Sequence, residues 1–181
     1  MRVIAGHLGG RRLTAPRGLA TRPTTDRVRE ALFSALSTVE GARVLDLYAG
    51  TGALGIEAIS RGAASAVFVE SARPAAQALR ANLASLAIEP FCRVIVEPVA
   101  RAAARLASEA NAFDLVFADP PYDDVDEALT ALETLTPAFE PGARIVLEHA
   151  SRRPPRPSSR FETIRTRTYG DTALAFLALN P

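Results

Sequence analysis

The sequence predicts an α/β domain built on a Rossmann-like, mostly parallel central sheet with helices on both faces. The main observation is that short apolar runs alternate with amphipathic helical runs from Ala42 onward, because parallel strands must be joined by crossover helices. A glycine-rich loop follows the first of these apolar runs. The last two runs, Phe161–Thr168 and Ala173–Leu179, follow each other without a helix, which predicts a C-terminal antiparallel strand pair.

The spacing of the apolar residues predicts where each remaining element lies. We expect parallel strands at Arg43–Leu47, Ala66–Glu70, Arg93–Val96, Leu115–Ala118 and Arg144–Leu147. Helical spacing predicts helices at Ala53–Ser60, Pro74–Ser85, Ala100–Ala107 and Val125–Leu135.

The N-terminal part is expected to be a small extension of the main domain. Two short strands, Arg2–Ala5 and Arg12–Ala15, surround a glycine-rich turn. A helix with its N-cap among residues 24–26 follows, and Gly41 ends it. We therefore divide the chain into a hairpin and helix extension, residues 1–40, and a main domain, residues 41–181.

The composition is that of a globular protein, with 48% hydrophobic and 23% charged residues among 181. No apolar run approaches the ~20 residues of a bilayer span. The N-terminus lacks the apolar core of a signal peptide, so we expect a cytoplasmic protein without membrane association. The single cysteine, Cys92, is expected to be buried and inert. No heptad pattern or long apolar edge indicates an obligate dimer, so we expect a monomer.

The net charge is only +1, but its distribution along the chain is uneven. Residues 1–29 contain seven arginines and one acidic residue, whereas residues 30–150 contain eight arginines and seventeen acidic residues. Residues 151–181 contain six arginines and two acidic residues. Two basic ends around an acidic middle indicate a polyanionic partner such as a nucleic acid. The alternative is a pair of solvated basic ends.

The stretch VLDLYAGTGALGIEA, Val44–Ala58, contains the spacing G-x-G-x-x-G after an apolar strand. Such a loop brings the backbone close to a ligand, and the next helix offers free N–H groups. Dinucleotides and S-adenosylmethionine (SAM) are both bound in this way. Glu70, at the end of the next strand, would bind the ribose hydroxyls of either ligand. The loop alone leaves both ligands open.

Asp46 favours SAM because it is an acid within the apolar strand that precedes the loop. There it can face the cationic aminoacyl end of SAM, whereas it would repel a diphosphate. A second interpretation is equally supported: the carboxylate accepts loop N–H groups and only shapes the turn.

The motif Asp119-Pro120-Pro121-Tyr122 follows the fourth apolar strand. Two prolines hold the chain extended, so that the Asp119 carboxylate and the Pro120 carbonyl can point together into the crevice at the strand ends. Both groups accept hydrogen bonds, and together they could orient an exocyclic amino group toward an electrophile. Tyr122 offers a flat face for a base extruded from its stack. This motif predicts amino-group methylation.

The combination of LDLYAGTGALGIEA with ADPPY resembles Class I SAM-dependent methyltransferases that modify exocyclic amino nitrogens. More narrowly, the chain resembles bacterial small-subunit (16S) ribosomal RNA guanine-N2 methyltransferases of the RsmD type. Four further stretches carry this resemblance, which spans nearly the whole chain: RVIAGHLGGRRL at 2–13, RPTTDRVREALF at 22–33, ALGIEAISRGA at 53–63 and YGDTAL at 169–174.

The resemblance implies a Class I fold and methyl transfer from SAM to the N2 atom of guanine 966 in small-subunit ribosomal RNA, free or in an assembling subunit. The residues implied to contact SAM are Asp46, Gly50, Thr51, Gly52 and Glu70, together with Thr25. Asp119, Pro120, Pro121 and Tyr122 would hold the guanine. Arg2, Arg11, Arg12, Arg22 and Arg27 are the expected RNA-binding residues.

One departure from the family pattern concerns the SAM adenine. Where related enzymes often carry an acid that meets the SAM adenine, this chain has VEPVA, so either Glu97 or the backbone near Val99 takes that role. Gly55 is interpreted as a helix-packing residue. We expect no metal, because His7 and His149 are scattered and form no ligand set.

Three rival functions belong to other classes. One is an amino-methyltransferase that acts on another RNA or on DNA adenine. The second is a nicotinamide oxidoreductase, which would use the glycines but leave the Asp119 motif without a role. The third is a non-catalytic assembly factor that binds ribosomal RNA. Transfer of label from methyl-labelled SAM separates the methyltransferases from the other two.

Overall fold

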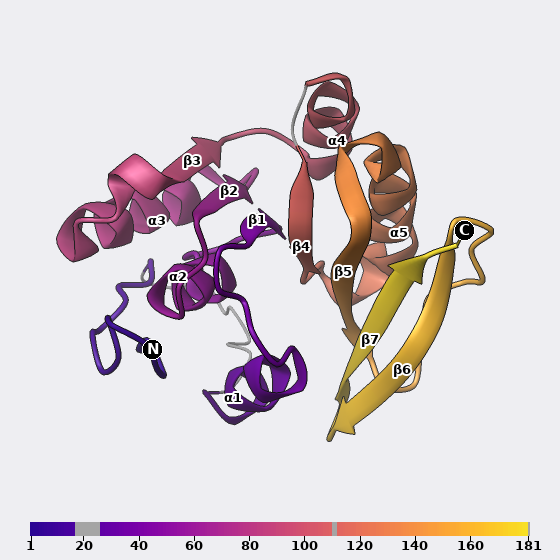
Figure 1. Ribbon diagram of the computed structural model, residues 1–181, viewed down its shortest axis with the longest axis horizontal. Coiled ribbons are helices and arrows are strands. Elements are labelled where there is room, and N and C mark those ends of the chain that lie inside the picture. The colour runs from indigo at the N-terminus through magenta and orange to yellow at the C-terminus, as the bar shows by residue number, and fades with distance from the viewer. Residues whose placement is uncertain (17–25, 110–111, 181) are drawn as a thin grey trace.

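The computed structural model describes residues 1–16, 26–109 and 112–180. Its strands are β1 (Arg43–Leu47), β2 (Ser65–Val69), β3 (Cys92–Ile95), β4 (Phe113–Ala118), β5 (Phe139–Ala150), β6 (Phe161–Tyr169) and β7 (Thr172–Leu179). They form one seven-stranded sheet in the order β3-β2-β1-β4-β5-β7-β6 (Figure 1). The first five strands in this order, β3, β2, β1, β4 and β5, are parallel. Strand β7 is antiparallel to both β5 and β6. The predicted mostly parallel sheet and C-terminal antiparallel pair are confirmed.

The helices cover both faces of the sheet, as expected. They are α1 (Asp26–Ala35), α2 (Ala53–Ser60), α3 (Arg73–Leu86), α4 (Val99–Ser108) and α5 (Val125–Thr134), with short 3₁₀ turns η1 (Glu89–Phe91), η2 (Tyr122–Asp124) and η3 (Thr136–Ala138). Val44 joins the hydrophobic core beneath α1, α2 and α3, whereas its neighbour Leu45 joins the core beneath α4 and α5. Successive side chains alternate between the two faces of a strand, which explains this division.

The strand order determines where a ligand can bind. From β1 the chain passes to β2 on one side, and β4 later returns to the other side of β1. Open α/β sheets bind ligands at such a switch point, beyond the carboxyl ends of the strands. The glycine loop follows β1 and the Asp119 motif follows β4, so both lie at this point.

The two predicted N-terminal strands are wrong. Arg2 and Arg12 form a single antiparallel bridge, and neither segment is a regular strand. The N–H groups of Ile4 and Ala5 instead donate to the buried carboxylate of Glu57 on α2, at 2.6 and 3.0 Å. The N-terminal backbone therefore pairs with a helix side chain. The division at residue 40 stays a prediction.

The first helix ends earlier than predicted, at Ala35 and not next to Gly41. Ser37 has a φ of 64°, a left-handed conformation that no α-helix continues through. The Arg144 guanidinium holds the turned chain by donating to the carbonyls of Leu36 and Thr38. This contact comes from β5 and has no local sequence signal.

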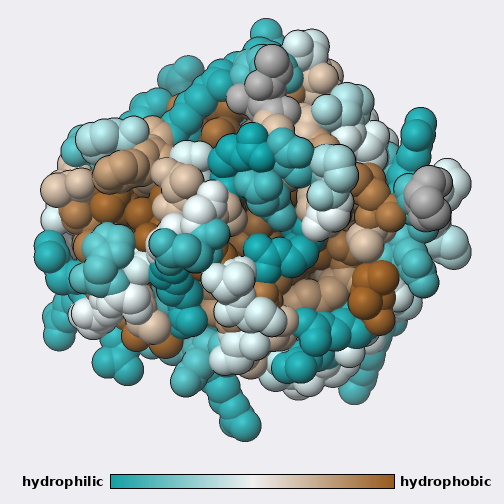
Figure 2. All heavy atoms as spheres, in the orientation of Figure 1, coloured by the Kyte–Doolittle hydropathy of each residue, from teal (hydrophilic) through white to brown (hydrophobic). Residues whose placement is uncertain are grey.

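Several predicted ends differ by one or two residues, and β5 is much longer than predicted. It extends from Phe139, which pairs with Phe113 of β4, to Ala150, which pairs with Thr172 of β7. Figure 2 shows that hydrophobic groups on the viewed face lie in separate patches between hydrophilic ones. No helix among the described residues is long and apolar enough to cross a membrane.

Candidate functional site

Three carboxylates meet at the carboxyl ends of neighbouring strands: Asp46 in β1, Glu70 after β2 and Asp119 after β4. We call them the site carboxylates. Asp46 is buried, and burial raises its pKa to about 7. A hydrogen bond from the Gly55 N–H partly opposes this rise, whereas the negative charges of Asp119 and Glu70 add to it. The site therefore disfavours further negative charge and favours a cation.

Glu70 holds the glycine loop in place. Its Oε2 accepts a 2.7 Å hydrogen bond from the N–H of Gly50, and its Oε1 accepts one of 2.7 Å from the N–H of Ala72. A carboxylate has about four acceptor positions, so both oxygens can still accept hydroxyl donors. Glu70 thus shapes the loop and can bind a sugar.

The three glycines of the loop differ in their surroundings. Gly50 has a φ of 56°, and a Cβ placed on it would meet no atom within 4 Å, so its backbone borders open space. Gly52 has a φ of 84°, and its Cβ would come within 2.3 Å of the Leu79 side chain. A Cβ on Gly55 would lie 2.3 Å from the Phe68 ring. The packing role predicted for Gly55 is confirmed, and Gly50 is the glycine that a ligand can approach.

Asp46 fulfils the structural interpretation, because its Oδ2 accepts a 2.9 Å hydrogen bond from the Gly55 N–H. This bond secures the first turn of α2 against β1. The charge of Asp46 also repels the charges of Asp119 and Glu70, so a cation bound among the three would stabilise the ionised form of Asp46. The two interpretations of this residue are compatible.

The Asp119 motif is anchored at both ends. The Asp119 N–H donates to the Leu47 carbonyl at 3.4 Å, which ties the motif to the end of β1. Pro120 is buried and Pro121 is extended, with φ −50° and ψ 142°. The Tyr122 hydroxyl forms a 2.7 Å hydrogen bond with the Thr172 hydroxyl at the start of β7. The motif therefore lies beside the glycine loop, as the sequence predicts.

Sequence reasoning missed three residues that shape this site. Thr172 holds Tyr122, although only its place in YGDTAL hinted at a role. The buried Asn82 of α3 donates to the Thr51 carbonyl at 3.0 Å, and a polar residue on that apolar helix face was the available signal. Tyr48, between β1 and the loop, has a φ of 59°, a strained conformation that often marks functional sites.

The adenine contact stays open between two predicted groups. The Glu97 carboxylate is paired with Arg105 at 2.5 Å and with Arg101 at 3.6 Å, both on the helix that follows it. Val99 begins α4, whose first turn presents N–H groups without partners inside the helix. The ion pairs make Glu97 the less available of the two.

The structure describes four of the five predicted RNA-binding arginines. Arg11 donates to the Ser85 carbonyl at 3.0 Å, near the C-terminal end of α3 and thus away from the strand ends that carry the site. Arg2 pairs with Asp26 at 3.5 Å and forms the backbone bridge with Arg12, and both Arg12 and Arg27 are exposed. Arg22 and Thr25 lie outside the described residues.

Arg29, which the sequence did not single out, is the buried arginine of α1. It donates to the Arg2 carbonyl and to Asp26, and burial lowers its pKa. Its Nε and Nη1 atoms have no hydrogen-bond partner within the part of the chain that the structure describes. Arg29 thus fastens the N-terminal segment to α1.

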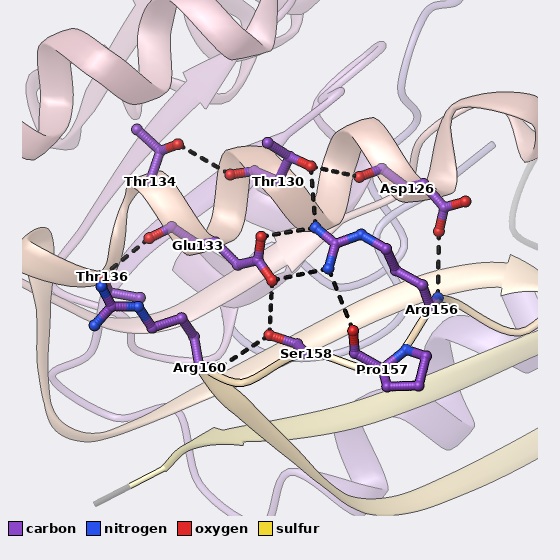
Figure 3. Close-up of polar contacts among 9 residues, drawn as sticks. All are labelled: Asp126, Thr130, Glu133, Thr134, Thr136, Arg156, Pro157, Ser158 and Arg160. Carbon is purple, nitrogen blue, oxygen red and sulfur yellow. Dashed lines mark hydrogen bonds and ion pairs between the residues drawn. The ribbon is translucent and has the colours of Figure 1, made fainter.

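A second polar cluster lies away from the site carboxylates, between α5 and the loop that precedes β6 (Figure 3). We call it the α5 cluster. Glu133 pairs with Arg156 at 2.7 Å and accepts a 2.8 Å hydrogen bond from the Ser158 hydroxyl. A hollow of about 600 Å³ is lined by residues of this cluster, among them Thr130 and Arg160. Within the described ranges, no group of three or more His, Cys, Asp or Glu could hold a metal ion.

Comparison with known proteins gives consistent matches along the chain. The family model described as "Conserved hypothetical protein 95" matches residues 1–178. "Putative rRNA methyltransferase YlbH" of Bacillus subtilis is 39% identical over 181 residues, 97% of each chain. "Ribosomal RNA small subunit methyltransferase D" of Escherichia coli K12 is 42% identical over 136 residues, 74% of this chain and 67% of that protein. The predicted RsmD-type family is confirmed.

A solved structure gives the same result for the fold. "Putative methyltransferase yhhF" from Escherichia coli superposes with a TM-score of 0.81 at 34% identity, covering 98% of this chain and 96% of that one. The predicted Class I methyltransferase fold is confirmed.

Proposed function

The chain belongs to the family described as "Conserved hypothetical protein 95", and from this premise we propose that it is a SAM-dependent methyltransferase of small-subunit ribosomal RNA. The proposed target is the exocyclic N2 of a guanine, guanine 966 in the family's designation. One observation carries the proposal: the glycine loop and the Asp119 motif occupy neighbouring strand ends, β1 and β4, and are joined by the Asp119–Leu47 hydrogen bond.

The residues present suit SAM in charge and shape. The sulfonium and ammonium groups of SAM are cationic, and the three site carboxylates are acidic. Burial raises the pKa of Asp46 to about 7 in the free protein, so a bound cation would favour its ionised form. Glu70 retains acceptor capacity for ribose hydroxyls, and the backbone at Gly50 borders open space. A pyrophosphate would face these carboxylates and be repelled, which disfavours a nicotinamide cofactor.

The chemistry supplied by bound SAM is an electrophilic methyl group. The guanine N2 lone pair is delocalised into the ring, so the protein must orient the nitrogen and exclude competing water. The Asp119 carboxylate and the Pro120 carbonyl accept its two N–H groups, while Tyr122, held by Thr172, stacks on the base. On methylation N2 must lose one proton, and the Asp119 carboxylate, which would accept the hydrogen bond from that N–H group, is placed to receive it.

The partner that follows from this proposal is small-subunit ribosomal RNA, free or within an assembling subunit. The proposal includes the cytoplasm as the location and a monomer as the active form. It also includes RNA contacts from the N-terminal arginines. Arg11 lies near the C-terminal end of α3, away from the strand ends, so it would contact RNA remote from the target guanine.

The direct test is label transfer from methyl-labelled SAM to unmodified small ribosomal subunits, followed by mapping of the modified nucleotide. We expect label on one guanine at N2. The Asp119→Ala variant should lower kcat by roughly 10³-fold, because it removes the acceptor that orients N2, while SAM affinity stays within a few fold.

Two outcomes would contradict the proposal. Normal turnover in Asp119→Ala would remove Asp119 from the mechanism. SAM binding with no label on RNA, or label on DNA adenine, would favour one of the rival functions.

A further inference from the structure

Strand β6 is unlike the other strands because neither of its faces is buried. Residues 162–168 are all exposed, and β6 is the last strand of the sheet, paired on one side with β7. Figure 1 shows β6 and β7 at one end of the sheet, beyond α5. In the same orientation, Figure 2 shows hydrophilic groups interleaved with hydrophobic ones over this area.

The pairing of β6 with β7 shows on which face of the sheet each exposed side chain of β6 lies. Arg165 pairs with Phe176 and Arg167 pairs with Leu174, and both β7 residues belong to the core beneath α1, α2 and α3. Cross-strand partners point to the same face of a sheet. Arg165 and Arg167 therefore lie side by side on the α1 face of β6. Glu162 pairs with Ala178 at the far end of the strand, so the positive charge is concentrated toward the carboxyl end of β6.

The same register relates Arg167 to the catalytic motif. Arg167 pairs with Leu174, and Leu174 pairs with Glu148 of β5. Ala118, the residue before Asp119, pairs with Leu147, the residue before Glu148. Arg167 is thus level with Asp119 and separated from it by three strand spacings, about 14 Å.

The arginines are oriented but retain free donors. The Arg165 guanidinium lies 4.3 Å from the centre of the Phe176 ring and donates to the Ala35 carbonyl at 2.5 Å. A guanidinium has five N–H donors, so most remain for a ligand. Among the described residues neither Arg165 nor Arg167 forms an ion pair.

We propose that the α1 face of β6, with Arg165 and Arg167, binds the phosphate backbone of the RNA strand that carries the target guanine. This inference rests on the proposed function and adds the docking surface to it. The surface is continuous with the site, because Tyr169 ends β6 opposite Thr172, whose hydroxyl binds Tyr122. A distance of about 14 Å equals roughly four rises of 3.4 Å along a stacked strand, so the contacted phosphates lie a few nucleotides from the guanine.

The chemistry favours RNA over a protein partner. A planar guanidinium fork matches the phosphate group, and two arginines on alternate positions of a strand follow a linear polyanion. Apart from Ile164, which is 59% exposed, the exposed residues of β6 are threonine, arginine and Glu162, too polar for the core of a protein interface.

The test compares the salt dependence of binding to unmethylated, transcribed small-subunit ribosomal RNA. Arg167→Gln should lower the slope of log K against log salt concentration by about 0.7–0.9, the value of one phosphate contact. The double variant Arg165→Gln/Arg167→Gln should lower it by about twice as much. Arg167→Lys, which keeps the charge, should keep the slope. The matched control is Arg80→Gln, which removes an exposed arginine on α3 and should leave the slope unchanged.

Each result of this experiment has one meaning. Arg167 makes no hydrogen bond or ion pair in the described structure, so Arg167→Gln should retain the melting temperature and SAM affinity. An unchanged slope in both glutamine variants, with label transfer intact, overturns the docking surface and leaves the proposed function standing. A shift in oligomeric state with an unchanged slope assigns β6 to contact between copies and also overturns it. Failure of the wild-type protein to label RNA overturns the proposed function itself.

Discussion

Asp46 and Glu70 at the strand ends accept hydrogen bonds from backbone N–H groups of the glycine loop, whereas Glu133 of the α5 cluster accepts them from Arg156 and Ser158. Among the described residues, no ion pair reaches Asp46 or Glu70. Burial raises the pKa of Asp46, but the hydrogen bond from Arg156 lowers the pKa of Glu133. Both regions contain carboxyl groups, but their surroundings shift the pKa values of these groups in opposite directions.

This difference distinguishes the proposed SAM site from the α5 cluster. The hollow beside the α5 cluster, about 600 Å³, has a volume typical of ligand sites, yet its carboxylate already has a cationic partner. Buried carboxylates without a cation are costly in the free protein, and a cationic ligand removes that cost. Charge therefore favours the strand ends as the SAM site, whereas hollow volume alone would favour the α5 cluster.

Among the changes that compare these two regions, the largest effect on SAM affinity is expected at Glu70. Glu70→Gln replaces one acceptor oxygen by an N–H donor group that opposes the N–H groups of Gly50 and Ala72, so SAM affinity should fall roughly 10–100-fold. Titration calorimetry measures this change. The matched control, Glu133→Gln in the α5 cluster, should leave SAM affinity unchanged, and equal losses in both variants would invalidate the comparison.

Asp46 should make SAM binding depend on pH. Its pKa of about 7 means that it is protonated in the free protein at lower pH, while the cationic ligand requires the carboxylate. The Kd for SAM should therefore rise about tenfold between pH 8 and pH 6. A titration series over this range should show the change, and Asp46→Asn should weaken binding and remove the pH dependence.

Asp46 should also make the stability of the free protein depend on pH, but a rise in pH should lower this stability whereas it strengthens SAM binding. The folded pKa lies above the unfolded value of 3.8, so this group makes the free protein less stable as pH rises from about 4 to about 7. Asp46→Asn should then raise Tm at pH 8 in the absence of SAM. A lower Tm would show that the hydrogen bond to Gly55 outweighs the burial of charge.

Thr172 should have a moderate effect through Tyr122. Thr172→Val removes the hydroxyl that holds the Tyr122 hydroxyl, so kcat/KM for RNA should fall about 3–10-fold, mainly through KM. Thr172→Ser should restore it, and SAM affinity should not change. Steady-state kinetics with RNA as the varied substrate would contradict this positioning role if serine and valine behaved alike.

The smallest effect is expected in the α5 cluster. Glu133→Ala removes an ion pair near the surface, so Tm should fall by about 2–4 °C at most, with label transfer unchanged. Thermal unfolding and the label assay measure the two quantities. Loss of activity would indicate that the loop before β6 takes part in catalysis.

Sequence patterns predicted the parts of the fold that depend on neighbouring residues. The bounds of β1 and α2 agree with those expected, Arg43–Leu47 and Ala53–Ser60, because an apolar run followed by a glycine turn is a local signal. Contacts between distant segments were missed. Glu57 accepts a hydrogen bond from the Ile4 N–H group, 53 residues away in the chain, where a strand was predicted. Arg144 binds the Leu36 carbonyl after α1, 108 residues away.

The amino-acid sequence was sufficient to predict the order of strands and helices from Arg43 onward, the glycine loop, the Asp119 motif and the uneven charge. These follow from hydrophobic period, turn residues and motif spacing, which are properties of consecutive residues. Three relations became visible in the folded chain alone: no ion pair among the described residues reaches Asp46 or Glu70, Thr172 holds Tyr122, and Arg167 is level with Asp119. These relations arise from sheet register and packing, which bring together residues whose separation in the chain carries no signal.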